Sequence, residues 1–296
     1  MRILHSFWSK PFLKTQGINN WDRSNGGWLE RRYNYYSWAL SCLKFNQFYE
    51  GIELYTDDFG HDLFVEKLKL PYKRVNVKLN QLDGYDPNLW ALGKLVTYGL
   101  QEEPFLHADG DVFIWGKFRK ECHNSPLVVQ NLENDFDYYS DIFNELEKEF
   151  KHVPISILQH NEFNPRFSGI NAGILGGNDI EFIQEYVKIA LKFVNENLPY
   201  ISKINIGLFN NFYEQCLFRI LADRSNSKIV PLLNYVNDRF DGLCDLTSVS
   251  NSRSYAHAVG IYKKRKETNQ LVEYHLKSEF PEYYYRINYL LKNHLI

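Results

Sequence analysis

The sequence has few cysteines and no long apolar run. Its four cysteines, Cys42, Cys122, Cys216 and Cys244, lie far apart among 296 residues and form no Cys-x-x-Cys pair. This spacing excludes a zinc ribbon and a disulfide framework, so we expect reduced, mostly buried thiols. No run of about 18 apolar residues occurs, which argues against a transmembrane helix. The N-terminal stretch is too short and too polar for a signal-peptide core, so we expect a cytoplasmic protein.

The sequence also lacks a large net charge of either sign. Lysine and arginine number 34 and aspartate and glutamate number 36, which leaves a net charge of −2. The whole molecule therefore has no field that would attract a nucleic-acid backbone, and we expect no nucleic-acid partner. The 17 glycines and 10 prolines are not an enrichment, whereas hydrophobic residues reach 44%. This composition excludes collagen-like and disordered chains and predicts a sizeable core.

The first half of the sequence alternates between predicted strands and predicted helices. We expect strands over 2–8, 51–55, 72–77 and 105–108, and helices over 29–45, 89–101 and a short stretch that ends at Leu68. This alternation predicts an α/β fold, with a mostly parallel sheet and helices on both of its faces. Ligands of such sheets bind beyond the carboxyl ends of the strands, which is where Asp57 and Asp109 stand.

The second half is less regular. We expect strands over 127–132, 170–176, 228–233 and 255–260, and helices over 135–150, 179–197 and 204–223. No internal repeat or linker interrupts the chain, so we expect one domain over 1–296 with a C-terminal helical segment, 280–296. Its tyrosines, leucines and isoleucines recur at helical spacing with Arg286, Lys292 and His294. Two interpretations of this segment stay open: a helix that packs on the domain, or weak, reversible contact with a membrane surface.

Two aspartates one residue apart follow the predicted strand Phe105-Leu-His-Ala108. Asp109 and Asp111 are separated by Gly110, after which an apolar run resumes. Carboxylates placed in this way can converge on one hard divalent cation such as Mg²⁺ or Mn²⁺. The alternative is a simple hairpin, because Asp-Gly between apolar runs is a turn signal.

Three further stretches carry polar groups in apolar surroundings. Asn171-Ala172-Gly173 lies among small residues that would let a ligand approach the backbone, although a tight turn explains the glycine equally well. Glu214 and Gln215 interrupt an apolar helical pattern, as partnered buried groups do, or else mark an exposed face. His257 and, six residues later, Lys263 read individually as a structural histidine and a solvated lysine.

Taken together, the order of these motifs resembles the nucleotide-sugar glycosyltransferases of the GT-A fold, most closely glycosyltransferase family 8 with its glycogenin-like and lipopolysaccharide galactosyltransferase-like members. The matching pattern is strand-Asp-x-Asp, Asn-Ala-Gly-Ile-Leu, Glu-Gln and His-x-x-Gly-x-x-Lys, over residues 51–263. Glu214 replaces the aspartate usual in the family, and the Pro-Trp that commonly follows the last lysine is absent. The whole chain also resembles a group of uncharacterised bacterial proteins known as a domain of unknown function.

The resemblance implies roles for individual residues, which are predictions. It assigns a Mn²⁺ or Mg²⁺ ion to Asp109, Asp111 and His257, and nucleotide or diphosphate binding to Asp57, Lys94 and Lys263. It assigns the donor sugar to Asn171, Ala172 and Gly173, and catalysis to Glu214 and Gln215. Trp21 and Trp28 belong to a polar N-terminal stretch that is either a lid over the donor or a surface loop.

The activity that the resemblance implies is metal-dependent transfer of a hexose from a nucleotide sugar, a UDP-sugar in the family, to a glycan, lipid-linked or peptide acceptor. Family 8 enzymes retain the anomeric configuration, but Glu214 would be a candidate base in an inverting enzyme, so the stereochemistry stays open. Two other functions stay open as well: a catalytically silent protein that binds nucleotide sugars or glycans, and a metal-dependent nucleotidyltransferase.

Overall fold

The structure of the protein is a computed structural model, in which residues 1–13, 25–134 and 136–296 are described. Contacts between Cα atoms divide the chain into two compact units. Unit 1 consists of Met1, residues 88–107 and residues 118–239, and unit 2 of residues 2–87, 108–117 and 240–296. Each unit thus joins segments that are far apart in the sequence. The expectation of one domain over 1–296 stays a prediction.

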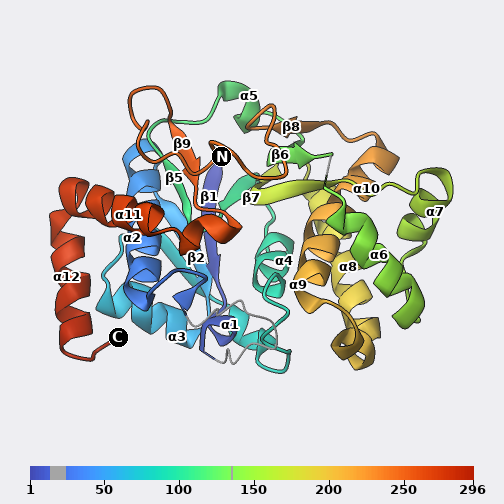
Figure 1. Ribbon diagram of the computed structural model, residues 1–296, viewed down its shortest axis with the longest axis horizontal. Helices are drawn as coiled ribbons and strands as arrows, with labels where there is room; N and C mark the ends of the chain where they lie inside the picture. Colours follow the sequence, from blue (N-terminus) through green and yellow to red (C-terminus); the bar gives the residue numbers. More distant parts are fainter. Residues whose placement is uncertain (14–24, 135) are drawn as a thin grey trace. The chain divides into compact units, whose positions relative to one another are not determined.

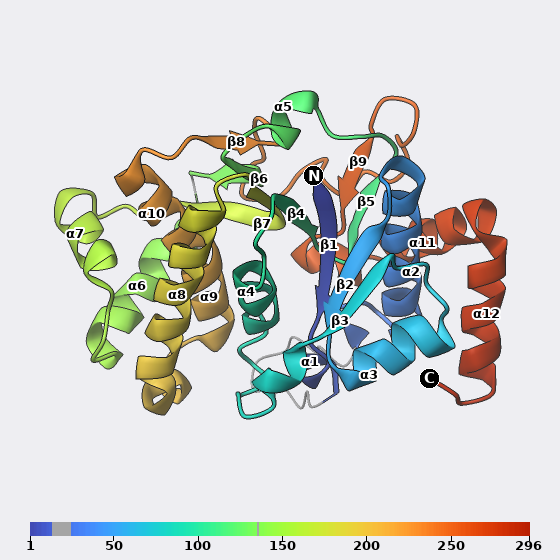
Figure 2. The same ribbon diagram turned by 180° about the vertical axis from the view of Figure 1, so that it is seen from behind.

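The sheet of unit 2 contains three parallel strands. They are β1 (Arg2–Phe7), β2 (Ile52–Thr56) and β3 (Arg74–Val77), in the order β3-β2-β1, and Figure 2 shows them side by side. Every residue of the central strand β2 is buried. Its one charged residue, Glu53, is held by Arg2 and Arg74 of the neighbouring strands, at 2.7 Å and 2.5 Å. Because these arginines compensate the carboxylate, the strand can be buried on both faces.

The helices of unit 2 pack mainly on one another and on a second, smaller sheet. The unit contains α1 (Lys10–Leu13), α2 (Arg31–Phe48), α3 (Asp58–His61), the π-helical segment Asp62–Lys67, the 3₁₀ turns Leu79–Leu82 and Gly260–Lys264, α11 (Lys266–Glu279) and α12 (Pro281–Lys292). Helices α2, α11 and α12 lie together (Figure 1). On the sheet side of α2, the rings of Phe7, Trp38 and Phe64 pack with centroids 4.7–5.3 Å apart, and they form part of the core.

The smaller sheet decides how the Asp109–Asp111 turn is built. It consists of β5 (Val112–Ile114) and β9 (Tyr255–His257), paired antiparallel. The strand before the turn, β4 (Phe105–Ala108), is not part of this smaller sheet. The hairpin alternative is therefore wrong, because the strand after the turn pairs with a segment near the C-terminus and not with the strand before it.

Unit 1 contains four strands and most of the remaining helices. Its strand order is β4, β7 (Gly169–Gly177), β6 (Leu127–Glu133), β8 (Ile229–Pro231). Strand β6 pairs antiparallel with β7 and parallel with β8. The helices are α4 (Leu92–Gly99), α5 (Lys120–His123), α6 (Tyr138–Glu149), α7 (Ile155–Phe163), α8 (Ile180–Asn197), the 3₁₀ turn Leu198–Lys203, α9 (Ile206–Asn211), the π-helical segment η5 (Phe212–Cys216) and α10 (Leu217–Ser225).

These elements confirm the predicted α/β class, and the described strands other than β5 lie within a few residues of their expected positions. Two expectations differ in detail. The single helix predicted over 204–223 is α9, η5 and α10 in succession, because a single π-helical turn inside an α-helix disturbs the apolar pattern over only a few residues. Helices α7 and α11 were not predicted. In α7 only Ser156 and Ile157 are buried, so it has no apolar stripe. All four cysteines are free thiols, and three of them are buried.

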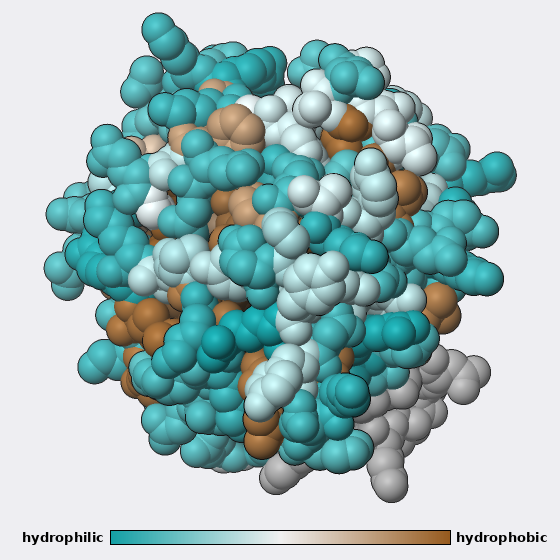
Figure 3. Space-filling view, turned by 90° about the vertical axis from the view of Figure 1, so that its left-hand side faces the viewer, coloured by the Kyte–Doolittle hydropathy of each residue, from teal (hydrophilic) through white to brown (hydrophobic). Residues whose placement is uncertain are grey.

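The C-terminal segment forms a helix that packs within unit 2. In α12, Ile287 and Leu290 are buried, and Asn288 accepts a hydrogen bond of 2.9 Å from the Tyr36 hydroxyl of α2. The surface that carries α11 and α12 is mostly hydrophilic, with hydrophobic residues in separate small groups (Figure 3). Within the described ranges, no helix has both the length and the apolar character to cross a membrane. Membrane contact through this segment stays a prediction.

Candidate metal and sugar site

The Asp109-Gly110-Asp111 turn of unit 2 is clamped by helix α2. The hydroxyl of Ser37 donates to the Gly110 carbonyl oxygen at 2.8 Å. A Cβ atom at position 110 would lie 2.5 Å from the ring of Trp38. Only glycine therefore lets the helix approach the turn so closely, and the two carboxylates are presented from a backbone that packing holds in place.

Strand pairing brings His257 to this turn. In the β5–β9 ladder Val112 is the partner of His257, and Ala258 N–H donates to the Asp111 carbonyl at 3.0 Å. Although 257 − 111 = 146 positions separate the two residues, their backbones are thus adjacent. The sequence showed the motif order but contained no local signal for this pairing.

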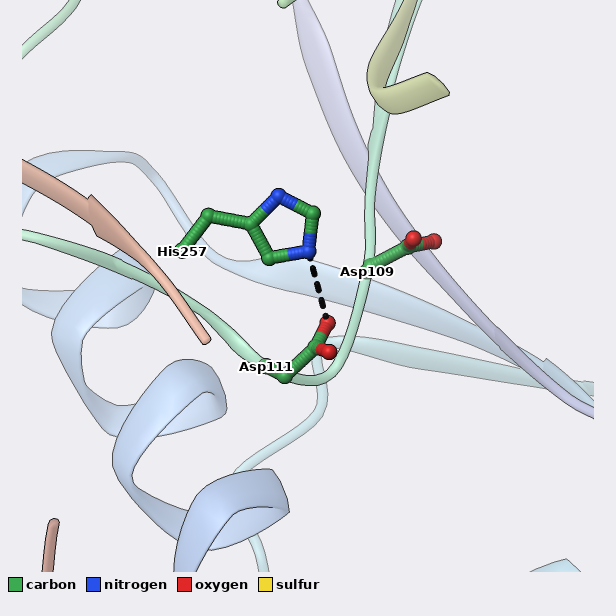
Figure 4. Close-up of side chains that lie close together, drawn as sticks. All are labelled: Asp109, Asp111 and His257. Carbon is green, nitrogen blue, oxygen red and sulfur yellow. Dashed lines mark ion pairs between the residues drawn. The ribbon is translucent and has the colours of Figure 1, made fainter. Parts of the chain in front are cut away.

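The three predicted metal ligands lie together. One ligand atom from each of Asp109, Asp111 and His257 can be chosen so that all lie within 4.8 Å of one another. His257 Nε2 is 3.4 Å from Asp111 Oδ1, and Figure 4 shows these two side chains pointing toward each other beside the Asp109 carboxylate. His257 and Asp111 are buried, whereas Asp109 is half-buried. Two carboxylates and an imidazole form a donor set that a divalent transition metal can use.

Lys263 places a positive charge next to the same carboxylate. Its Nζ lies 2.5 Å from Asp111 Oδ2, 3.5 Å from the Gly26 carbonyl oxygen and 5.8 Å from the centre of the Trp28 ring. Burial by itself would raise the pKa of the Asp111 carboxyl, but Lys263 and His257 outweigh burial and hold that pKa well below its ordinary value. Asp111 is therefore an anion over the physiological pH range, as a metal ligand must be.

Trp28 is almost fully buried, with 1% of its surface exposed. Trp21, the other tryptophan of the expected lid or loop, lies outside the described residues.

Asp57 lies at the expected position after β2, where it has a structural role. It caps α3: its Oδ1 accepts from Gly60 N–H at 2.9 Å, and its Oδ2 accepts from Ser9 N–H at 2.7 Å. Both carboxylate oxygens are thus engaged by backbone groups. A contact between Asp57 and a nucleoside stays a prediction.

Unit 1 contains a buried ion pair between two other predicted site residues. Lys94 Nζ of α4 lies 3.1 Å from Oε1 of Glu214, whose side chain is fully buried, and 3.4 Å from the Ala172 carbonyl oxygen. The Tyr98 hydroxyl donates to the same Glu214 oxygen at 3.2 Å, and the Tyr186 hydroxyl donates to the Glu214 backbone carbonyl at 2.7 Å. The polar interruption seen in the sequence is thus a buried, partnered carboxylate on a π-helical turn, a feature that is frequent at functional sites.

The remaining predicted residues of unit 1 belong to a hydrogen-bonded cluster. Asn171 Oδ1 accepts from Gly173 N–H at 3.0 Å, and Asn171 Nδ2 donates to Glu133 Oε1 at 2.9 Å. The hydroxyl oxygen of Tyr139 lies 2.9 Å from Gln215 Oε1 and 2.7 Å from Glu133 Oε2. Glu133 and Tyr139 were missed at the level of the sequence. The available signal was Glu133 itself, which directly follows the predicted apolar strand over 127–132. A carboxylate at such a position is costly to bury without partners.

Comparison with known proteins gives one family and several distant structural similarities. A family model described as "Family of unknown function (DUF6734)" matches residues 1–290. No curated protein sequence matches the chain. Among solved structures, a complex of the galactosyltransferase LgtC with donor and acceptor sugar analogues is 13% identical, covers 91% of this chain and 83% of its own, and has a TM-score of 0.40. Mouse xyloside xylosyltransferase 1 without ligand is 9% identical, covers 86% and 94%, and has a TM-score of 0.39.

These solved structures are glycosyltransferases, the class that the motifs resemble.

Proposed function

The chain belongs to DUF6734, a family of unknown function, and we propose that it is a metal-dependent glycosyltransferase that moves a sugar from a nucleotide-sugar donor to an acceptor. The observation that carries this proposal is the convergence of Asp109, Asp111 and His257 with Lys263 beside them. A nucleotide-sugar donor presents a diphosphate, whose negative charge a divalent cation and a nearby positive charge stabilise. The order of the motifs along the chain supports the same activity.

The residues present fit Mn²⁺ better than Mg²⁺. Mg²⁺ favours oxygen ligands and retains several waters, whereas an imidazole nitrogen suits transition metals. Lys263 and His257 face different oxygens of Asp111, Oδ2 and Oδ1 respectively. A cation at this site would stabilise the negative charge that develops on the diphosphate when the sugar leaves.

The residues of the protein itself would share the remaining tasks. Lys263, whose ammonium group is held by Asp111 and the Gly26 carbonyl, would bind the diphosphate and stabilise its charge as the glycosidic bond breaks. Lys94 would bind the nucleotide or diphosphate, and Asn171, Ala172 and Gly173 would bind the donor sugar. Glu214 and Gln215 would act in catalysis. UDP is the nucleotide that the family resemblance favours. A glycan, lipid-linked or peptide acceptor is compatible with this assignment.

The experiment is Mn²⁺ titration followed by a screen of nucleotide sugars for Mn²⁺-dependent hydrolysis and transfer. His257→Ala should weaken Mn²⁺-dependent UDP binding and lower the rate about 10²-fold or more, as loss of a contact to developing charge does. His152→Ala, which changes an exposed histidine, is the matched control and should behave as wild type. Because His257 and Lys263 act on the same diphosphate, the double variant should lose less than the sum of the two single losses.

Three results would overturn the proposal. Mn²⁺ dependence that is equal in wild type and His257→Ala would remove His257 from the site. Tight donor binding with no turnover toward water or any acceptor would indicate a silent binding protein. Binding of a nucleoside triphosphate with release of pyrophosphate would indicate a nucleotidyltransferase. The anomeric configuration of a transfer product would separate retention from inversion.

A further inference from the structure

A buried glutamate at the end of β6 organises the polar cluster of unit 1. Glu133 is 1% exposed. Its Oε1 accepts from Asn171 Nδ2 at 2.9 Å, and its Oε2 is 2.7 Å from the hydroxyl oxygens of both Tyr138 and Tyr139. Burial first, and then the charge of Glu133, raise the pKa of both tyrosines well above the ordinary value. Both hydroxyls therefore stay protonated, and each donates a hydrogen bond to Glu133.

Tyr139 has one proton and two neighbouring acceptors. Besides Glu133 Oε2, its hydroxyl oxygen faces Gln215 Oε1 at 2.9 Å. A phenol donates a single hydrogen bond, and the shorter contact, to a carboxylate, is the stronger one. The atom of Gln215 that faces Tyr139 must then be a donor. Turning the amide by 180° about its last bond exchanges Oε1 and Nε2, which are nearly equal in size, and satisfies both partners.

We propose that Tyr139, held by Glu133, is a positioning residue that orients the Gln215 amide, with Nε2 donating to the Tyr139 hydroxyl and Oε1 turned away from it. Gln215 is half-buried, whereas Tyr139 and Glu133 are buried, so the amide is the end of the chain Glu133–Tyr139–Gln215 that a ligand can reach. The part of this proposal that concerns a sugar rests on the proposed function. In that case Gln215 Oε1 is a hydrogen-bond acceptor for a hydroxyl group of the donor sugar.

Packing holds Tyr139 in this position independently of its hydrogen bonds. Gly169 is the partner of Glu133 in the β6–β7 ladder, and a Cβ atom there would lie 2.3 Å from both Cζ and the hydroxyl oxygen of Tyr139. On another side, the ring centroid of Tyr138 lies 4.3 Å from that of Tyr139. The hydroxyl can therefore move little, and Gly169→Ala is a way to displace it without removing a polar group.

The chain offers a matched control. Tyr138→Phe and Tyr139→Phe each remove one hydrogen bond of 2.7 Å to the same oxygen of Glu133. Within the described residues, the Tyr139 hydroxyl also has a hydrogen-bond contact with Gln215, whereas the Tyr138 hydroxyl has none with it. A purely structural role predicts similar effects of the two substitutions, whereas a positioning role predicts that Tyr139→Phe alone affects Gln215.

The first test is independent of any activity. In protein labelled with nitrogen-15 glutamine, the side-chain NH₂ signals of Gln215, assigned by their loss in Gln215→Ala, should show slow hydrogen exchange. Tyr139→Phe and Gly169→Ala should shift these signals and accelerate their exchange, and Tyr138→Phe should leave them nearly unchanged. Signals of Gln215 that are the same in wild type and Tyr139→Phe, or that respond equally to Tyr138→Phe, would overturn the proposal, whether or not the protein is a glycosyltransferase.

The second test measures turnover of the donor found in the screen. Tyr139→Phe should lower kcat about tenfold, the size expected for one lost hydrogen bond, with a smaller change in KM. Tyr138→Phe should cost less, and Tyr139→Phe combined with Gln215→Ala should be no slower than Gln215→Ala alone. Equal losses in the two tyrosine variants would overturn the positioning role. Wild-type protein that turns over no nucleotide sugar would refute the proposed function instead, while the nitrogen-15 experiment still decides the orientation of Gln215.

Discussion

Lowering the pH from 7 to 5 is expected to destabilise the protein through His5, a fully buried residue of β1. Ser41 Oγ donates to the Val112 carbonyl at 2.7 Å and is 3.1 Å from His5 Nε2. Since that hydroxyl has already given its proton, Nε2 carries a hydrogen and donates to Ser41. His5 Nδ1, 3.1 Å from the Tyr72 hydroxyl, is then the acceptor. The folded protein thus holds a neutral imidazole with both nitrogens engaged.

Burial lowers the pKa of His5 from 6.5 to about 3, with the charge of Asp111 partly opposing the shift. The unfolded chain therefore binds a proton between these two pH values that the folded protein does not bind, so stability falls as the pH falls from about 6.5 toward 3. Between about pH 6.5 and pH 5, a span of about 1.5 pH units, the free energy of unfolding falls by roughly 2 kcal/mol, at about 1.36 kcal/mol per unit. Below about pH 3 the contribution of His5 no longer changes.

The assay is urea unfolding of wild type and His5→Gln at pH 7 and pH 5. Other titrating groups contribute to both proteins, so the difference between their pH dependences isolates His5. Wild type should lose about 2 kcal/mol more than the variant between the two pH values. Equal pH dependence would show that His5 is solvated or protonated in the folded protein and would refute the reasoning.

Three further predictions concern the packing within each unit. Gly110→Ala should lower both the Mn²⁺ affinity and the unfolding free energy, the latter by about 1–3 kcal/mol, because the added Cβ would overlap the Trp38 ring. Calorimetric titration measures the affinity and urea unfolding measures the stability. Gly84→Ala, at a position with open space around it, is the control and should change neither. Lys94→Met should destabilise the protein by about 3–5 kcal/mol in urea unfolding, since it leaves the buried Glu214 carboxylate without its cation, and a loss under 1 kcal/mol would argue against this ion pair. Removing α12 should expose the apolar surface that Ile287 and Leu290 cover and yield aggregated protein on size-exclusion chromatography; soluble, active protein that no longer co-sediments with anionic vesicles would favour membrane contact instead.

Local features of the chain were readable because they depend on neighbouring residues. The alternation of apolar strands with amphipathic helices predicts the α/β class without any knowledge of contacts. The Asp-x-Asp pair after an apolar strand marks the turn at which a metal site is proposed, since two carboxylates two positions apart are rare beside buried residues. Glu214 stood out for the same reason, as a charge inside an apolar helical pattern.

By itself, therefore, the sequence determined the order and type of most elements and the residues from which a metal and sugar site is proposed. Tertiary structure decided which distant segments meet. Only the β5–β9 pairing shows that His257 reaches Asp111 and that the Asp-Gly turn is not a hairpin. Only the β6–β7 ladder shows that Glu133 faces Gly169, and only the hydrogen bonds of Tyr139 show that it lies between Glu133 and Gln215. The physical reason is that propensity and periodicity act over a few residues, whereas pairing depends on how buried polar groups far apart in the chain satisfy one another.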